Sequence, residues 1–254
     1  MATTQETIIP NASQVSRGAW QPSLVRLICG GLVGSLIGLG IYRGIYPIFS
    51  VPFEVSNLPS PVPLAALEKL EAYQFRVDCQ NYPIVFGLTG LVVGIVSALL
   101  AMKTPLRGMI LAGVLGGTLA AIGGLLAAML VKSIRTTAAS DIVIAGITID
   151  SMMQAILTQA AIWGLMGLGV GAGMGIAGGG LVTGMKAALS GMLGGIFAAM
   201  AFVILAAVIF PTSSSSHVVP LAFLEQVIVM ALSGICICGA IGIGVRQRER
   251  KGNS

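Results

Sequence analysis

Few side chains in this sequence could do chemistry, and their spacing favours no catalytic or metal site. His217 is the single histidine, so a haem held between two histidines of the chain is excluded. Cys236 and Cys238 are two residues apart, a spacing that points their side chains to different faces of a helix. The sequence contains no HExxH, GxSxG or GxxxxGK[ST] motif. We therefore expect no enzyme, no bound metal and no cofactor.

Four charged residues lie at predicted ends of membrane spans and could line an outer vestibule. Glu68, Asp150 and Glu225 precede or open three predicted helices, and Arg43 lies near the end of another. A carboxylate at a helix N-terminus is stabilised by the helix dipole by about 0.3–1 kcal/mol, so helix capping is the alternative role of the three acids. The alternative for Arg43 is a side chain that extends to the lipid headgroups.

Small residues recur every four positions on several predicted helices, which places them on one helix face. The sequence has 35 glycines, about twice the average share of about 7%. We expect glycine faces that pack helix against helix, formed by Gly30, Gly34, Gly38, Gly116, Gly124, Gly167, Gly171, Gly175 and Gly179.

Two other roles stay open for the glycines. The faces could form a smooth pore wall, and the run GLGVGAGMGIAGGG could be a broken helix that exposes carbonyls to a cavity. If the role is packing, a leucine at Gly171 should destabilise the protein, and a leucine at the neighbouring Val170 should be tolerated better.

The elements that position these residues are apolar segments long enough to cross a bilayer. Of the 254 residues 56% are hydrophobic and only 9% are charged, against about 25% charged in a soluble domain. A span needs about 20 apolar residues. Six segments meet that length, at about 24–46, 83–102, 108–131, 152–177, 181–210 and 221–245.

The remaining segments are polar. Residues 1–23 form a polar N-terminal segment and residues 246–254 a basic tail. An outer loop is expected over 48–82, with a short helix that begins at Pro63, because proline suits the first position of a helix. The fold class expected is thus an all-α polytopic integral membrane protein with a six-helix membrane domain over 24–245.

Cationic residues predict the orientation. With the N-terminus inside, nine of the fourteen Lys and Arg lie on the inner side. Cytoplasmic segments carry the excess of Lys and Arg in membrane proteins. We expect both termini in the cytoplasm, with the bacterial inner (plasma) membrane as the location. The nine inner cations are Arg17, Arg26, Lys103, Arg107, Lys186, Arg246, Arg248, Arg250 and Lys251.

Three sequence matches indicate an internal repeat. FGLTGLVVG at 86–94 matches WGLMGLGVG at 163–171, which pairs Gly90 with Gly167. GVLGG at 113–117 matches GMLGG at 191–195, which pairs Gly117 with Gly195. VPLAALE at 62–68 matches VPLAFLE at 219–225. The offsets of 77, 78 and 157 predict a two-helix unit repeated three times in parallel orientation.

These features favour a small channel or transporter-like protein of unspecified solute. The alternative is a non-catalytic structural or assembly subunit of a larger membrane complex, which the lack of chemistry and the small-residue faces also suit. The expected partners are the lipid bilayer and either further copies of the chain or subunits of a membrane complex. Nucleic acid is not expected, because the excess positive charge lies in short segments beside the spans.

Overall fold

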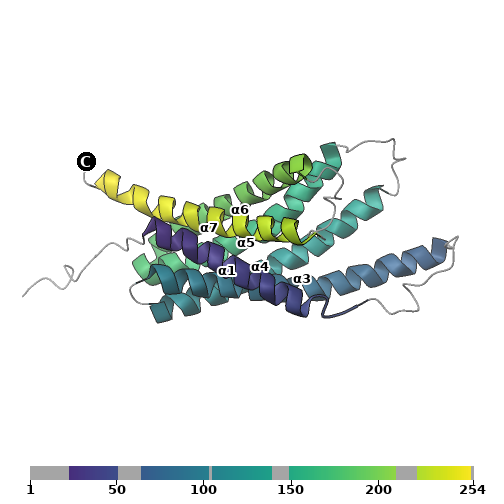
Figure 1. Cartoon of the computed structure of the whole chain (residues 1–254), viewed down its shortest axis with the longest axis horizontal. Coiled ribbons are helices and arrows are strands. Elements are labelled where there is room, and N and C mark those ends of the chain that lie inside the picture. The colour runs from purple at the N-terminus through teal and green to yellow at the C-terminus, as the bar shows by residue number, and fades with distance from the viewer. Residues whose placement is uncertain (1–22, 51–63, 103–104, 139–148, 210–221, 253–254) are drawn as a thin grey trace, which may run out of the picture.

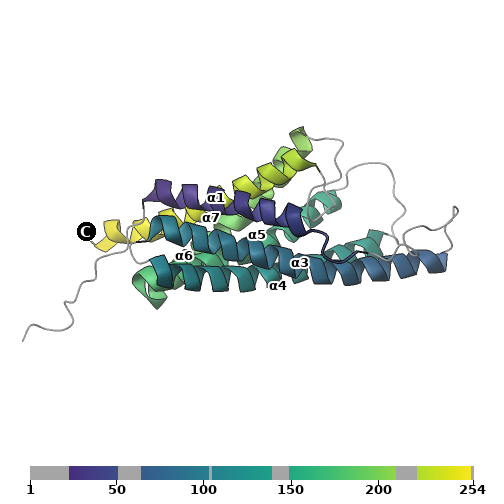
Figure 2. The ribbon, with the colours of Figure 1, turned by 60° about the horizontal axis from the view of Figure 1, so that its bottom comes forward.

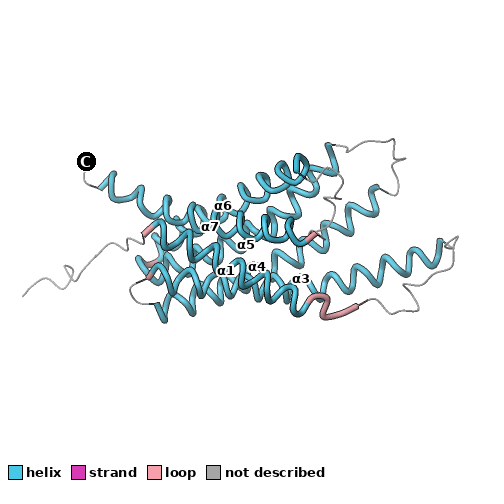
Figure 3. The backbone as a smooth tube through the Cα atoms, in the orientation of Figure 1, coloured by secondary structure: helices cyan, strands magenta, loops and turns pink. Residues whose placement is uncertain are grey.

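The computed structural model describes residues 23–50, 64–102, 105–138, 149–209 and 222–252. All regular structure in these ranges is helical (Figure 3). The helices are α1 (Leu24–Ile45), α3 (Leu64–Ala101), α4 (Pro105–Ala138), α5 (Ile149–Gly179), α6 (Leu181–Ile209) and α7 (Phe223–Gly252). Each contains a stretch long and apolar enough to cross a membrane. The prediction of an all-helical structure with six helices long and apolar enough to cross a membrane is confirmed.

The six helices run lengthwise in one bundle (Figures 1 and 2), and the order of their contacts closes a ring. Each helix packs against the next in the chain, and α7 packs against α1. Across the middle of the ring, α3 and α7 both touch α5. In α5 61% of the span is buried, against 39–44% in the other helices, so α5 is the most enclosed element. We call the end of the bundle where α3, α5 and α7 begin the distal end; α1 begins and α7 ends at the opposite end (Figure 1).

The helix α3 is longer than the sequence predicts. The predicted loop with a separate short helix from Pro63 is wrong for residues 64–82, because they continue into the span as one helix with Pro83 inside it. An internal proline removes one backbone hydrogen bond and weakens a helix. Here α4 supports the backbone: a Cβ atom on Gly124 would lie 2.7 Å from the Tyr82 carbonyl oxygen and 3.1 Å from the Pro83 nitrogen.

The nine glycines of the predicted faces all lie against a neighbouring helix. On α1, Gly30, Gly34 and Gly38 face α3, where added Cβ atoms would lie 2.7–2.9 Å from Ser97, Val93 and Thr89. Gly167, Gly171, Gly175 and Gly179 of α5 face α6, Gly116 faces α3 and α5, and Gly124 faces α3. Because α5 is continuous from Ile149 to Gly179, the broken-helix alternative is wrong.

Three pairs of glycines bring helix backbones into direct contact. In each pair, a Cβ atom on either glycine would fall against the carbonyl oxygen of the other. One pair joins α3 to α4, one joins α5 to α6, and one joins α7 to α1. We call them the crossing glycines: Gly90 with Gly116, Gly167 with Gly191, and Gly234 with Gly31.

The turn between α5 and α6 depends on one glycine conformation. Gly180 has φ of 81°, and its N–H donates to the Ile176 carbonyl at 3.1 Å. Alanine in this left-handed region costs about 1–2 kcal/mol. We expect Gly180→Ala to lower the free energy of unfolding by about that amount, although an added Cβ meets nothing within 4 Å. Thermal unfolding in detergent measures it.

Gly40→Ala is the matched control for that substitution. Gly40 is helical, and an added Cβ there also meets nothing within 4 Å. Its helix propensity improves, so its melting temperature should stay equal or rise. Equal melting temperatures for Gly180→Ala and Gly40→Ala would show that the φ of Gly180 is not a constraint.

Candidate functional site

Contacts across the ring identify the side chains that face the central axis. The rings of Phe86 on α3 and Trp163 on α5 meet edge to face, with centroids 6.1 Å apart and an interplanar angle of 83°. A Cβ atom on Gly167 of α5 would lie 3.3 Å from Ile237 Cγ1 on α7. In the ring, α4 lies between α3 and α5, and α6 lies between α5 and α7. Both contacts therefore pass through the middle of the ring.

A set of three polar side chains occupies this inner face at the distal end. Tyr82 lies one turn before Phe86 and contacts it at 6.1 Å between ring centroids. Gln159 lies one turn before Trp163, whose indole Nε1 donates to the Gln159 Oε1 at 2.8 Å. On α7, Gln226 precedes Ile237 by eleven residues, about three helical turns, and shares its face. We call Tyr82, Gln159 and Gln226 the polar layer; they are 8%, 4% and 7% exposed.

An apolar layer follows the polar layer one turn further into the bundle. Phe86, Trp163 and Met230 are fully buried there. Val93, Val170 and Ile237 are buried two turns further in, past a turn that includes the buried Met166 and Ser233. The central axis is therefore closed in this structure by packed apolar side chains.

The residue before each member of the polar layer is also polar and buried: Asn81, Thr158 and Glu225. The carboxamide of Asn81 binds the backbone of Phe49, just after α1. Its Oδ1 accepts from the Phe49 N–H at 3.0 Å, and its Nδ2 donates to the Phe49 carbonyl at 2.8 Å. This pair of hydrogen bonds holds the chain that leaves α1 against α3.

Replacing Asn81 with leucine is expected to lower the free energy of unfolding by about 1–3 kcal/mol, because the backbone N–H and carbonyl of Phe49 both lose their partner. Thermal unfolding in detergent measures the loss. The control is Gln80→Leu, one position away on the exposed face of α3, where a change within about 0.5 kcal/mol is expected. If the two variants melt alike, the two hydrogen bonds add nothing to stability.

Tyrosines surround this junction between α1 and α3. Tyr42 and Tyr46 are stacked, with ring centroids 4.8 Å apart. Burial raises the pKa of the Tyr46 phenol, and the negative charge of Asp78 adds to the rise. The phenol therefore stays neutral at physiological pH.

The four charged residues proposed for an outer vestibule occupy different environments. Arg43 is exposed, and its guanidinium lies 4.8 Å from the centre of the Phe223 ring at the start of α7. Glu225, two residues further on, is 5% exposed. Glu68 is exposed on α3, fourteen residues before Tyr82 and thus about 20 Å along the helix from the polar layer. The side chain of Asp150 lies outside the described residues.

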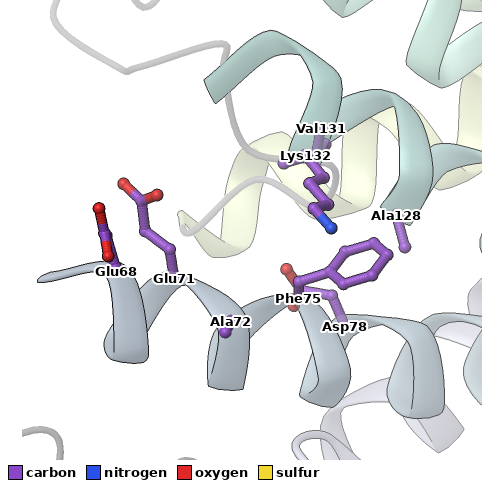
Figure 4. A pocket seen from close by; sticks show the side chains of 8 residues that line it. All are labelled: Glu68, Glu71, Ala72, Phe75, Asp78, Ala128, Val131 and Lys132. Atoms are coloured by element: carbon purple, nitrogen blue, oxygen red, sulfur yellow. The ribbon is translucent and has the colours of Figure 1, made fainter. Parts of the chain in front are cut away.

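Glu68 instead lines a pocket between the distal parts of α3 and α4 (Figure 4). The pocket has a volume of about 220 Å³. The Lys132 ammonium lies 4.4 Å from the centre of the Phe75 ring, and Glu68 and Glu71 point side by side into the same region. The lining is Glu68, Glu71, Ala72, Phe75, Asp78, Ala128, Val131 and Lys132.

Among the described residues, no group of three His, Cys, Asp or Glu side chains is placed to hold a metal ion. The comparisons with protein-family models, curated proteins and solved structures find no match to this chain. The site must therefore be interpreted from its own chemistry.

Proposed function

We propose that this chain is a small membrane transport protein, a channel or carrier, whose route follows the axis between α3, α5 and α7. The observation that carries the proposal is the polar layer. Polar side chains inside a membrane protein are costly unless they have partners, and they commonly mark solute pathways. Three of them, from three helices, lie buried at one level near one end of the bundle.

A threefold repeat is the architecture we propose for this route. Its units are the antiparallel pairs α3 with α4, α5 with α6, and α7 with α1, related by a pseudo-threefold axis along the membrane normal. In support, every pair has one set of crossing glycines. Tyr82, Gln159 and Gln226 each stand eight residues before the crossing glycine of their own helix. The third unit then joins the last helix to the first.

The crossing glycines favour a register that differs in part from the sequence matches. Gly90 and Gly167 play the same role, as the offset of 77 predicts. On α4 and α6, Gly116 and Gly191 make the equivalent contacts. The sequence match instead pairs Gly117 with Gly195, a register that differs from the contacts by three residues. The match of Glu68 with Glu225 pairs an exposed side chain with a buried one.

Reconstitution of the purified chain into liposomes tests the transport proposal. We expect the protein to raise the flux of at least one solute or ion in a tested panel more than tenfold over its flux into protein-free liposomes. Liposomes with the folded protein that remain as tight as protein-free ones for the whole panel would contradict it.

For the topology we propose that both termini face the cytoplasm and that the distal end faces outside, on the evidence of the nine-to-five division of Lys and Arg. A cysteine placed at Ser254, with the four native cysteines replaced by alanine, should react with an impermeant thiol reagent only after the cells are opened. Reaction in intact cells would show that the C-terminus faces outside and that the proposed orientation is wrong.

The alternative, a non-catalytic subunit of a membrane assembly, is favoured by a different observation. At about 1.5 Å per residue, the 38 residues of α3 span about 57 Å, well beyond a hydrocarbon core of about 30 Å. The projecting part, with the pocket of Figure 4, offers a charged surface to a partner. Purification in mild detergent distinguishes the two: stable stoichiometric partners favour the subunit.

A further inference from the structure

We infer that the route selects monovalent cations over anions, and that the carboxylates of Asp78 and Glu225 set this preference. The inference rests on the proposed transport function and names its substrate class. It comes from the sign of the charges that lie next to the polar layer and from an oxygen atom buried beyond it.

Asp78 brings a negative charge into direct contact with the polar layer. It lies one turn before Tyr82 on α3, and its carboxylate accepts a hydrogen bond from the Tyr82 hydroxyl. The same residue lines the pocket of Figure 4, between α3 and α4. Asp78 therefore links the pocket to the polar layer, and its charge favours a cation over an anion at both places.

Glu225 adds a second negative charge, next to Gln226 in the sequence. It is the one charged side chain that is buried among the described residues, with 5% of its surface exposed. It lies on the face of α7 that packs against α6, because Cys236 follows it by eleven residues and a Cβ atom on Gly194 of α6 would be 2.5 Å from the Cys236 carbonyl oxygen. No buried cation of the described chain offsets this charge. In an interior of low dielectric constant its field reaches the axis.

The positive charges of the distal end lie on its outer surface. Arg43, Lys69, Arg76 and Lys132 are all exposed. Water and dissolved salt screen exposed charges much more than buried ones. The two carboxylates beside the polar layer therefore dominate the potential within the distal end, and that potential is negative.

Two hydrogen-bond donors that an anion would need are already engaged at the polar layer. The Tyr82 hydroxyl donates to Asp78, and the Trp163 indole donates to the Gln159 Oε1 at 2.8 Å. The carboxamides of Gln159 and Gln226 carry donors and acceptors alike, so they favour neither sign. The layer therefore has negative charge to attract a cation and no positive charge to attract an anion.

Beyond the layer, the hydroxyl of Ser233 offers a further oxygen. Ser233 lies seven residues after Gln226, two turns along the same face of α7, and is fully buried. Its Oγ has no hydrogen-bond partner among the described residues. Oxygen atoms are the ligands that such cations prefer when they lose water. Since no group of three His, Cys, Asp or Glu in the described ranges could hold a metal ion, monovalent cations in passage fit better than a tightly bound divalent ion.

The apolar layer acts as the gate of such a route. Phe86, Trp163 and Met230 close the axis in this structure, so a flux of ions requires these side chains to move apart. Apolar constrictions gate ion pathways by excluding water. Charge preference and closure thus belong to different levels of the bundle.

Fluorescent reporters of K⁺, Na⁺ and Cl⁻ in proteoliposomes measure the preference, with a protonophore present to balance charge. We expect a K⁺ or Na⁺ flux about tenfold or more above that of protein-free liposomes and a Cl⁻ flux within about twofold of theirs. A Cl⁻ flux that rises as much as the cation flux, or a rise for neutral solutes alone, overturns the inference and leaves the transport function standing. Absence of every flux overturns the transport function itself.

Two matched variants test the role of the buried charge. Glu225→Gln keeps the size of the side chain, removes its charge and should lower the ratio of cation flux to Cl⁻ flux about fivefold. Glu68→Gln makes the same change at an exposed residue about 20 Å along α3 from the layer, where screening should keep the ratio within about twofold. If Glu225→Gln fails to fold, judged by circular dichroism and gel filtration, Asp78→Asn replaces it. Equal ratios in the folded variant and in Glu68→Gln would overturn the inference.

Discussion

Replacing Gly171 with leucine is expected to lower the melting temperature in detergent by about 6–12 °C. The reason is the contact between α5 and α6, where a Cβ atom on Gly171 would fall against the Ala187 carbonyl oxygen. Overpacking typically costs about 1–3 kcal/mol. A backbone carbonyl cannot rotate away as a side chain can, so a loss near about 3 kcal/mol is expected, at about 2–4 °C per kcal/mol for a chain of this size.

The control for that variant must come from another helix. A leucine at Val170 does not serve, because Val170 is fully buried and its Cγ2 would lie 2.7 Å from a Cβ atom on Gly116. Gly40 on α1 is exposed with nothing within 4 Å of an added Cβ, so Gly40→Leu should melt within about 2 °C of the wild type. If Gly171→Leu melts like Gly40→Leu, the glycine face of α5 is not a packing surface.

Replacing Trp163 with alanine should have the largest effect on stability, a loss of about 3–5 kcal/mol. Trp163 is the largest fully buried side chain of the core. Its removal leaves a cavity in the apolar layer, deletes the edge-to-face contact with Phe86 and removes the N–H donor to Gln159. Chemical or thermal unfolding in detergent measures the loss.

Trp163→Phe separates the packing of the ring from the hydrogen bond. Phenylalanine keeps an aromatic ring against Phe86 but lacks the indole N–H, so a loss of about 1–2 kcal/mol is expected. Equal losses in the two variants would mean that the Gln159 hydrogen bond, and not the filling of the axis, is what Trp163 supplies.

The sequence by itself determined that this chain is all-helical, with six helices long and apolar enough to cross a membrane. Its physical basis is strong: long apolar segments cannot leave backbone groups unpaired in lipid, so they form helices. The alternation of six spans then places the start of α1 and the end of α7 at the same end of the bundle. Spacing of four residues likewise showed which glycines share a helix face, because the helical period depends on local geometry alone.

Local signals failed where contacts between helices decide the outcome. Proline and the polar composition of residues 64–82 predicted a loop and a separate helix, yet α3 runs through Pro83 because α4 packs closely against the backbone there. The run of glycines before Gly180 permitted a broken helix, but contact with α6 keeps α5 continuous. In both cases the neighbouring helix provides what the local sequence lacks.

Only the tertiary structure decided which side chains meet at the candidate site. The sequence drew attention to charges, and Glu68 and Glu225 occupy different environments. The polar layer of Tyr82, Gln159 and Gln226 was missed, because three different residue types on three helices have no common motif. Their constant distance from Gly90, Gly167 and Gly234 could have revealed them. That signal has meaning only once the ring is closed by α7 against α1, a contact between the two ends of the chain that no local pattern encodes.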